Sequence, residues 1–278
     1  MKLAALRALF PTLSDPNDSL LLVSRLLAVS KASLLARDDV ALTDAEQQKL
    51  ETAASQLAAG LPLPYVLGEW DFFGRSFTVN PDVLIPRPET EMIIELALQW
   101  LQEHPTRQHS ILDVGCGTGI IPITLSLEVA SARCVAVDIS ESALKVASQN
   151  AHRLGCETRV QFIRSDLLAH CALIAEEATI LTANLPYIPT ATLKGLEVNG
   201  KEPTIALDGG EDGLDLIKAL LKQIHALRKT PPLILLEMEA RQGPALLNIA
   251  RSLFPRATAK VHQDLAGHDR VLEIRSAI

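Results

Sequence analysis

The chain has 278 residues, enough for one large domain and one small one. Hydrophobic residues make up 48% and charged residues 21%, a balance typical of globular proteins. A net charge of −7 argues against a basic nucleic-acid groove, and no apolar run is long enough to span a membrane, so we expect neither a nucleic-acid nor a membrane partner.

The four cysteines show no CxxC spacing and lie inside predicted secondary structure. We therefore expect no disulfide framework and no metal site, as in a protein from a reducing compartment. The first residues begin like a short apolar leader, but Arg7 interrupts the stretch and no small-residue cleavage site follows cleanly. These features predict a cytoplasmic location.

The N-terminal segment shows helical periodicity, because its leucines recur at helical spacing and no alternating strand pattern occurs. Thr43 and Glu46 have the spacing of a capping box, which predicts the start of a helix. Gly60 then supplies a left-handed stop. We expect residues 1–62 to form a small all-α domain without a chemical motif of its own.

The pattern changes after this domain. Apolar residues now stand among turn formers, which predicts a short β-hairpin between two domains. The residues behind this expectation are Phe73, Phe77, Val79 and Val83-Leu84-Ile85, among Gly68, Gly74, Asn80 and Pro81. We expect residues 63–87 to form this linker and residues 88–278 to form the catalytic domain.

Helical and strand patterns alternate from Glu89 onward, as in a mostly parallel sheet with helices on both faces. The expected helices are residues 89–103, 119–129, 140–154, 213–228 and 241–253. The expected strands are residues 110–113, 134–138, 160–164, 179–183, 232–237, 258–263 and 270–275. The last two strands are too close in sequence for a crossover helix, which predicts an antiparallel hairpin at one end of the sheet.

A glycine-rich turn lies between the first of these strands and the helix that follows it. Glycine in such a turn lets the backbone approach a ligand closely and adopt positive φ. Dinucleotide sites use a similar turn, although the spacing here is GxGxG rather than GxGxxG. The candidate cofactor-binding residues in the turn are Asp113, Gly115, Cys116, Gly117, Thr118 and Gly119.

Acidic residues also close the next two strands. Asp138 is placed to accept hydrogen bonds from ribose hydroxyls, and Asp166 lies where it would reach an adenine amino group. Leu167 could pack on the same ring. These aspartates could instead only cap the helices that follow, and Asp138 would serve NAD equally well. The loop after the fourth strand decides between these interpretations.

That loop carries Asn184-Leu185-Pro186-Tyr187. An amide, a proline-stiffened backbone and an aromatic ring, presented together, suit the task of holding a planar NH2 group and turning its nitrogen toward an electrophile. The alternative is an ordinary turn, because asparagine and proline favour turns. A dehydrogenase has no use for such a tetrapeptide, so its combination with the glycine turn indicates an S-adenosylmethionine-dependent amide or amine methyltransferase.

Further motifs accompany these two sites, and together they resemble the HemK/PrmC family, the release factor glutamine methyltransferases. The resemblance covers about residues 60–275. The motifs are Pro64-Tyr65-Val66-Leu67-Gly68, Phe73-Gly74, Val83-Leu84-Ile85-Pro86-Arg87-Pro88-Glu89-Thr90-Glu91, Glu202-Pro203, Ala206-Leu207-Asp208-Gly209-Gly210, Gly213-Leu214 and Asp264-Leu265-Ala266-Gly267-His268-Asp269-Arg270.

The resemblance implies a Rossmann-like class I S-adenosylmethionine-dependent methyltransferase fold. It also implies N5-methylation of the glutamine in the Gly-Gly-Gln motif of class I peptide release factors. The tetrapeptide from Asn184 to Tyr187 would then be catalytic and bind the substrate, with Asn184 also next to the cofactor. Arg87 and Glu89 are candidates for the substrate pocket, but could form only a surface salt bridge. No general base is expected.

One position departs from the family pattern, which most often has proline where this chain has Leu185. Leucine still offers its carbonyl, and its place before Pro186 favours an extended backbone, so we expect a slightly looser loop and unchanged chemistry.

Three alternative functions remain open. A ribosomal-protein glutamine methyltransferase would share most motifs, and a DNA adenine methyltransferase would share the tetrapeptide but should add a basic target-recognition region. The third is a non-catalytic scaffold that only binds S-adenosylmethionine. We expect a monomer whose helical domain docks the release factor.

Overall fold

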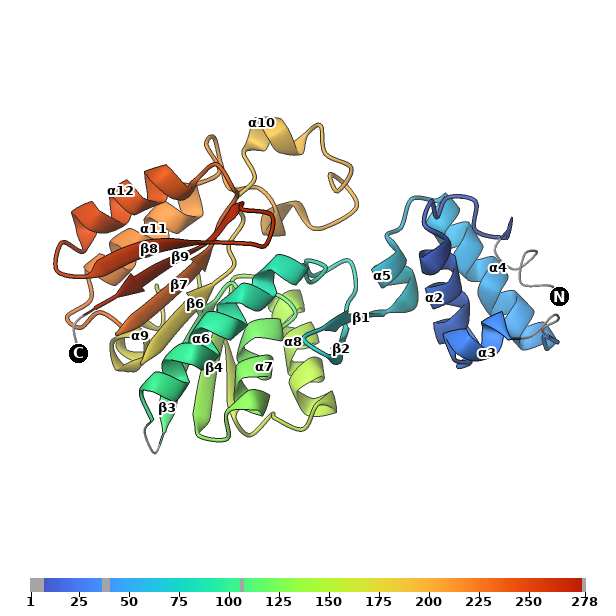
Figure 1. The fold of residues 1–278 in the computed structure, drawn as a ribbon, viewed down its shortest axis with the longest axis horizontal. Coiled ribbons are helices and arrows are strands. Elements are labelled where there is room, and N and C mark those ends of the chain that lie inside the picture. Colours follow the sequence, from blue (N-terminus) through green and yellow to red (C-terminus); the bar gives the residue numbers. More distant parts are fainter. Residues whose placement is uncertain (1–7, 37–40, 106–107, 277–278) are drawn as a thin grey trace. The chain divides into compact units, whose positions relative to one another are not determined.

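The computed structural model describes residues 8–36, 41–105 and 108–276. The chain divides into two compact units, Met1–Trp70 and Asp71–Ile278 (Figure 1). Among the described residues, no helix combines the length and apolar character needed to cross a membrane.

The first unit is helical, as the sequence predicts, although the first residues of the chain lie outside the described part. Its helices are α2 (Pro16–Leu26), α3 (Lys31–Leu35), α4 (Asp44–Ala58) and α5 (Leu63–Leu67). They pack around a leucine-rich core of their own, in which Leu22, Leu34 and Leu50 are fully buried. Burial of such side chains, rather than helix propensity, supplies most of the stability of short helices.

Helix α4 begins and ends where the sequence places its signals. The Thr43 hydroxyl accepts a hydrogen bond from the Glu46 N–H, and the Glu46 carboxylate accepts one from the Thr43 N–H, so the predicted capping box is confirmed. Gly60 follows the helix with a φ of +90°, the left-handed conformation that ends it.

The predicted hairpin is confirmed, but it is shorter than residues 63–87. It consists of β1 (Glu69–Phe72) and β2 (Arg75–Thr78), and Phe73 and Gly74 both have positive φ in the tight turn. Residues 63–67 form α5 instead, since Pro64 suits a first helical turn. Val83-Leu84-Ile85 lies beyond the hairpin in irregular chain between two prolines, which cannot donate to a strand ladder.

The second unit contains a seven-stranded sheet in the order β5-β4-β3-β6-β7-β9-β8. The first five strands of this order, from β5 through β4, β3 and β6 to β7, pair in parallel. Strand β9 pairs antiparallel with β7 and with β8. This arrangement confirms the predicted sheet and its C-terminal hairpin. The strands are β3 (His109–Val114), β4 (Ala132–Asp138), β5 (Val160–Arg164), β6 (Ile180–Ala183), β7 (Leu233–Glu237), β8 (Thr258–Gln263) and β9 (Asp269–Arg275).

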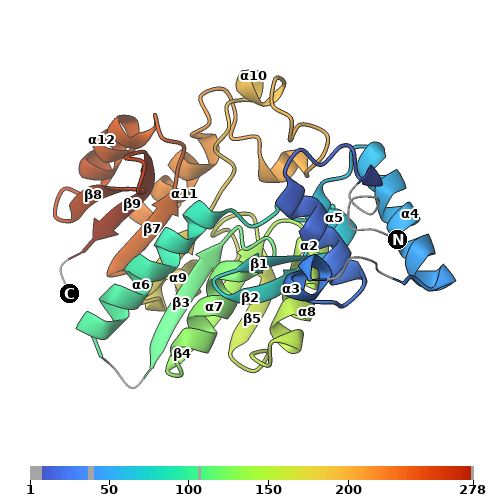
Figure 2. The ribbon, with the colours of Figure 1, turned by 45° about the vertical axis from the view of Figure 1, so that its right-hand side comes forward.

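Helices cover both faces of this sheet (Figures 1 and 2), which confirms the predicted Rossmann-like α/β architecture. Ile111 packs on one face with helices α6, α7 and α8, and the next residue, Leu112, packs on the other face with α9, α11 and α12. These helices are α6 (Glu91–Glu103), α7 (Ile120–Glu128), α8 (Glu141–Arg153), α9 (Ala172–Glu177), α11 (Asp215–His225) and α12 (Gly243–Leu253).

Short elements complete the second unit. The sequence patterns gave no signal for α9 or for α10 (Thr190–Leu193), because such short helices contain too few turns to show a periodicity. The 3₁₀ turn η1 (Pro88–Thr90) precedes α6 and has Pro88 at its first position, where proline is favoured. A second 3₁₀ turn, η2 (Thr204–Ala206), lies in the loop that follows α10.

Candidate active site

A pocket opens at the carboxyl ends of the parallel strands, where open α/β sheets bind ligands. It has about 1090 Å³ of free space, part of which is open to solvent. Residues at the ends of four strands line it: Gly115 to Thr118 after β3, Asp138 at the end of β4, Asp166 and Leu167 after β5, and Asn184 to Pro186 after β6. The glycine turn and the tetrapeptide therefore line one cavity.

Two glycines of the turn are required by close packing. A Cβ on Gly115 would lie 2.7 Å from Leu185 Cδ2, and φ at Gly115 is +76°. Gly119 has a φ of +79° at the start of α7, where a Cβ would lie 2.9 Å from Ile123. Gly119 itself does not line the pocket, so its part is to let α7 pack close to α8.

Asp138 faces the turn from the end of β4. Its carboxylate accepts hydrogen bonds from the Gly117 N–H and the Ser140 N–H, each over 2.9 Å. Burial raises the pKa of Asp138, although the backbone hydrogen bonds oppose this shift. Each carboxylate oxygen can accept a further hydrogen bond, so Asp138 is both a support for the turn and an available acceptor in the pocket.

Asp113 is, with Gly119, one of the two predicted cofactor residues that do not line the pocket. It is 1% exposed, and its Oδ1 accepts a hydrogen bond of 2.6 Å from the Thr182 hydroxyl. Burial raises the pKa of Asp113 to about 7. A carboxyl buried in this way is bonded to the neighbouring strand β6 and does not reach a ligand.

The loop after β6 presents acceptors toward the cavity. Asn184 donates from Nδ2 to the Thr90 hydroxyl over 3.0 Å. Within the described part of the chain, no group donates to Asn184 Oδ1 or to the Leu185 carbonyl. The Leu185 side chain is buried against Gly115, which holds the loop beside the glycine turn.

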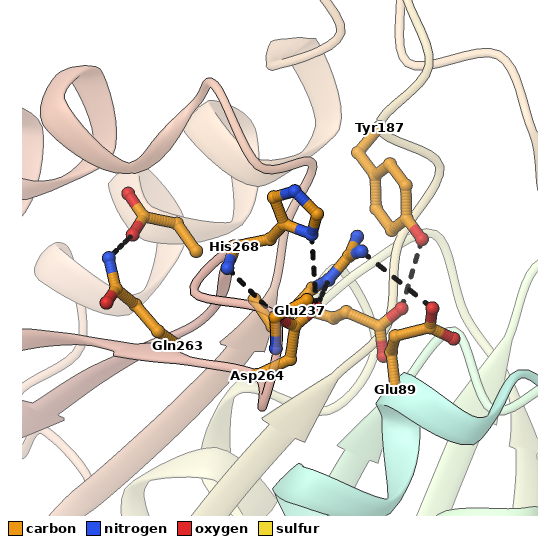
Figure 3. A network of polar contacts seen from close by, with 9 residues as sticks. Glu89, Tyr187, Glu237, Gln263, Asp264 and His268 are labelled. Atoms are coloured by element: carbon orange, nitrogen blue, oxygen red, sulfur yellow. Dashed lines mark hydrogen bonds and ion pairs between the residues drawn. The ribbon is translucent and has the colours of Figure 1, made fainter.

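Tyr187 is fixed at both its ring and its backbone. Its hydroxyl donates to Glu237 Oε1 over 3.1 Å (Figure 3), and its carbonyl accepts a hydrogen bond of 2.9 Å from the Gln242 side chain. Burial, followed by the nearby Glu237 carboxyl, raises the pKa of Tyr187, so the phenol stays protonated. The ring therefore acts as a surface and a donor, not as a base.

A second pocket adjoins the first, and six residues line both: Leu84, Arg87, Asn184, Leu185, Pro186 and Ala206. Tyr187 lines this second pocket only. Its remaining wall is apolar and consists of Ile188, Leu196, Val198 and Leu207. The tetrapeptide thus separates two adjoining cavities.

Arg87 and Glu89 have different partners, so the alternative of a salt bridge between them is wrong. Arg87 pairs with the buried carboxylate of Glu202, which also accepts a hydrogen bond of 3.0 Å from the Ile85 N–H. Glu89 lies 3.8 Å from Arg270 and lines neither pocket (Figure 3). Arg87 lines both pockets, which keeps it a candidate for contact with a substrate.

Four further residues shape the site: Gly209 and Gly213, which belong to motifs already quoted, and Glu237 and Gln242, which no motif singled out. Gly209 and Gly213 lie so close to the tetrapeptide loop that a Cβ would lie 2.7 Å from the Pro186 carbonyl or 2.2 Å from the Tyr187 carbonyl. Glu237 and Gln242 hold Tyr187 from β7 and from the start of α12. An acidic residue that ends a buried strand, as Glu237 does, resembles Asp113 and Asp138 and was the available signal.

Curated relatives match this chain over most of its length. The release factor glutamine methyltransferase of Moorella thermoacetica is 39% identical over 87% of this chain and 85% of its own. That of Cereibacter sphaeroides is 35% identical over 98% of this chain and 97% of its own. The chain belongs to the release factor glutamine methyltransferase family. Its Bacillus subtilis member is 34% identical over 93% of this chain and 90% of its own.

A family model agrees with this membership, and solved structures share the fold. Residues 5–68 match the PrmC N-terminal domain, and residues 90–189 match the ribosomal protein L11 methyltransferase (PrmA) model. The hMettl16 catalytic domain, solved with a MAT2A 3′UTR hairpin, has a TM-score of 0.64 at 15% identity and covers 95% of this chain and 92% of its own. The N-terminal domain of human METTL16 with SAH has a TM-score of 0.56 at 14% identity, covering 95% of this chain and 96% of its own. At such low identity these two structures support the fold alone.

Proposed function

We propose that this protein transfers the methyl group of S-adenosylmethionine to the side-chain nitrogen of a glutamine, the one in the Gly-Gly-Gln motif of class I peptide release factors. The observation that carries the proposal is that Asn184 and Leu185 offer two open acceptors in the wall of the cavity that the glycine turn lines. The names of the relatives support the choice of a release factor as substrate.

The residues of the first pocket fit this cofactor. Gly117 has no atom within 4 Å of where its Cβ would lie, so its backbone is open to a ligand. Asp138 has acceptor capacity left for ribose hydroxyls, and Asp166 and Leu167 lie at the far strand, where an adenine would be held. When bound, S-adenosylmethionine supplies an electrophilic methyl on a cationic sulfur.

The chain itself supplies orientation. An amide nitrogen is a weak nucleophile, because its lone pair is delocalised into the carbonyl. Asn184 Oδ1 and the Leu185 carbonyl would each accept one N–H of the substrate NH2 group, which sets its plane and turns its nitrogen toward the first pocket. The same acceptors stabilise the positive charge that develops on nitrogen during transfer.

Tyr187 would fix the position of the substrate amide by stacking against it. Its ring lines the second pocket and its hydroxyl is tied to Glu237, so the ring plane is fixed before substrate arrives. A planar amide stacked on this ring would have its NH2 end beside Asn184. Arg87, held by Glu202, stands where it could bind a backbone carbonyl of the substrate loop.

We assign the docking of the release factor to the N-terminal unit, because it has its own core and no catalytic motif. Deletion of residues 1–60 should weaken release-factor methylation far more than cofactor affinity. Equal loss of both would point to a purely structural role. We further propose that the protein acts as a monomer in the cytoplasm, where release factors are found.

Mass spectrometry tests the proposed function. The protein is mixed with methyl-labelled cofactor and a purified release factor, and the label is located by peptide mapping. The proposal requires the label on the glutamine of Gly-Gly-Gln and none on a release factor in which that glutamine is replaced by alanine. Label on another residue, or on a ribosomal protein or DNA offered in parallel, would contradict it.

A further inference from the structure

Gln242 is a buried polar residue to which the proposed transfer gives no part. It lies at the position just before helix α12, where serine, threonine, aspartate and asparagine commonly accept hydrogen bonds from the first N–H groups of a helix. Within the described part of the chain, the Gln242 side chain makes no such capping bond, and the residue is only 6% exposed. Capping of α12 therefore does not explain a glutamine at this position.

The hydrogen bonds of the Gln242 side chain lead to the backbone of other segments. Its Oε1 accepts from the Glu239 N–H over 3.0 Å. Its Nε2 donates to the Tyr187 carbonyl over 2.9 Å and to the Gly213 carbonyl over 3.2 Å, and the Asp212 carbonyl lies further away at 3.4 Å. A backbone N–H can only donate and a carbonyl can only accept, so these partners fix the orientation of the carboxamide.

The two closest acceptors belong to segments far apart in the sequence. Tyr187 ends the tetrapeptide loop after β6, whereas Gly213 belongs to the glycine-containing segment Gly209–Gly213 before α11. A Cβ on Gly209 would lie 2.8 Å from the Tyr187 Cα, and one on Gly213 would overlap the Tyr187 carbonyl. The two glycines therefore let this segment lie against the tetrapeptide loop, and Gln242 bonds with both.

The chain is also held on both sides of Tyr187. After it, Ile188 donates to the Leu207 carbonyl over 3.1 Å and accepts from the Gly209 N–H over 2.9 Å. Before it, the loop continues directly from β6, which lies between β3 and β7 in the sheet. The two open acceptors of the loop therefore lie on a short stretch between two fixed ends. The bond from Gln242 holds the downstream end.

We propose that Gln242 is a positioning residue that holds the tetrapeptide loop against the Gly209–Gly213 segment, so that the two open acceptors keep their direction toward the first pocket. This inference rests on the proposed transfer to an amide. A shift of about 1 Å in the groups that orient a substrate can lower the rate about a hundredfold. The cofactor should be less affected, because the glycine turn and Asp138 would hold it.

Two substitutions of Gln242 test the proposal by methyl transfer to a release factor. Gln242→Met keeps the length of the side chain but cannot donate. Gln242→Asn keeps the carboxamide but is one methylene too short to reach the Tyr187 carbonyl, and asparagine is favoured before a helix, so this variant should unfold at no lower urea concentration than wild type. Both variants should lower kcat at least tenfold, with cofactor affinity and KM for the release factor within threefold of wild type. Gln242→Asn with kcat within twofold of wild type would overturn the proposal.

A matched control separates positioning from loss of stability. Phe254 follows the other end of α12, where it is buried and contacts the edge of the His225 ring. Phe254→Leu should lower the urea midpoint at least as much as Gln242→Met does. Counted per molecule that binds cofactor, its kcat should stay within twofold of wild type. If Phe254→Leu lowered kcat as much as Gln242→Met, instability would explain both losses and the proposal would be wrong.

Hydrogen exchange tests the same bond without catalysis. The Ile188 and Thr190 N–H groups donate to the Leu207 and Gly210 carbonyls, so the peptide from residue 184 to 190 carries protected amides. These should exchange at least tenfold faster in Gln242→Met and at the wild-type rate in Phe254→Leu. Unchanged exchange in Gln242→Met would overturn the proposal whatever the substrate. A wild-type protein that methylates no release factor would contradict the proposed function, and the exchange rates would still decide the role of Gln242.

Discussion

Gly115 and Leu185 bring the cofactor turn and the tetrapeptide loop into contact, because a methyl group on Gly115 would lie 2.7 Å from Leu185 Cδ2. Gly115→Ala should therefore destabilise the protein through both a clash and a φ of +76°. The left-handed conformation alone costs about 1–2 kcal/mol for a residue with a Cβ. We expect the clash to add about 1–3 kcal/mol, as overpacking does in cores. Urea denaturation measures the sum.

The clash can be separated from the backbone cost in the same experiment. In a Leu185→Ala background the Gly115→Ala penalty should shrink to the backbone cost alone. Gly117→Ala is the matched control, since it has a φ of +52° and no atom within 4 Å of its Cβ position. An equal Gly115→Ala penalty in both backgrounds would show that the two loops do not touch as described.

Glu202 anchors the segment that carries Arg87. Glutamine at this position keeps only one acceptor oxygen, and its NH2 group would face either Arg87 or the Ile85 N–H as a second donor. Glu202→Gln should lower the free energy of unfolding by about 1–3 kcal/mol. It should also raise KM for the release factor more than that for the cofactor, because Arg87, which lines both pockets, is the proposed contact of the substrate loop.

The exposed Glu197, in the same loop, provides a control for the Glu202 variant. Glu197→Gln should change neither unfolding nor KM. If Glu202→Gln also left the KM for the release factor unchanged, the pairing of Glu202 with Arg87 would have no part in substrate binding.

The buried Asp113 predicts a dependence of stability on pH. Its pKa is raised from 3.8 to about 7 in the folded protein, so its favourable contribution is complete below about pH 4 and is lost as pH rises to about 7. Asp113→Asn mimics the protonated form and removes this loss. Relative to wild type, the variant should gain up to about 3 kcal/mol in the free energy of unfolding between pH 5 and pH 8.

Asp264→Asn is the control for the pH dependence of stability, because the pKa of Asp264 is lowered rather than raised. The Arg270 hydrogen bond holds the pKa of Asp264 at about 2, so this carboxyl is ionised in both the folded and unfolded protein from pH 5 to pH 8. Its stability difference from wild type should stay constant over that range. A constant difference for Asp113→Asn as well would mean that its carboxyl is ionised when buried.

The sequence predicts most of the fold, because long elements with clear periodicity bury one defined face. Strand β3 alternates between the two cores through Ile111 and Leu112, and α4 begins at the capping box of Thr43. The boundaries of the hairpin were wrong where proline interrupts the pattern. Val83-Leu84-Ile85 is apolar like a strand, yet its backbone is irregular, and Val83 and Leu84 line a pocket. Local pattern cannot distinguish these two uses of buried residues.

The sequence predicts those residues of the candidate site whose role depends on their place at the end of a strand. Gly115, Asp138 and Asn184 follow strand ends, and parallel strands bring those ends together. Asp113 also lies near a strand end, but its side chain is buried and bonded to Thr182 on β6, because successive residues of a strand point to opposite faces. Glu237 and Gln242 lie 50 and 55 positions from Tyr187 in the sequence, so only the folded chain brings them to it.

The most direct test of the account is single-turnover methyl transfer by Asn184→Ala at saturating cofactor and release factor. The account predicts a rate at least a thousandfold below wild type, because alanine removes the acceptor that orients the substrate amide, with cofactor affinity within about threefold. A rate within tenfold of wild type, or a loss of cofactor affinity as large as the loss of rate, would contradict it.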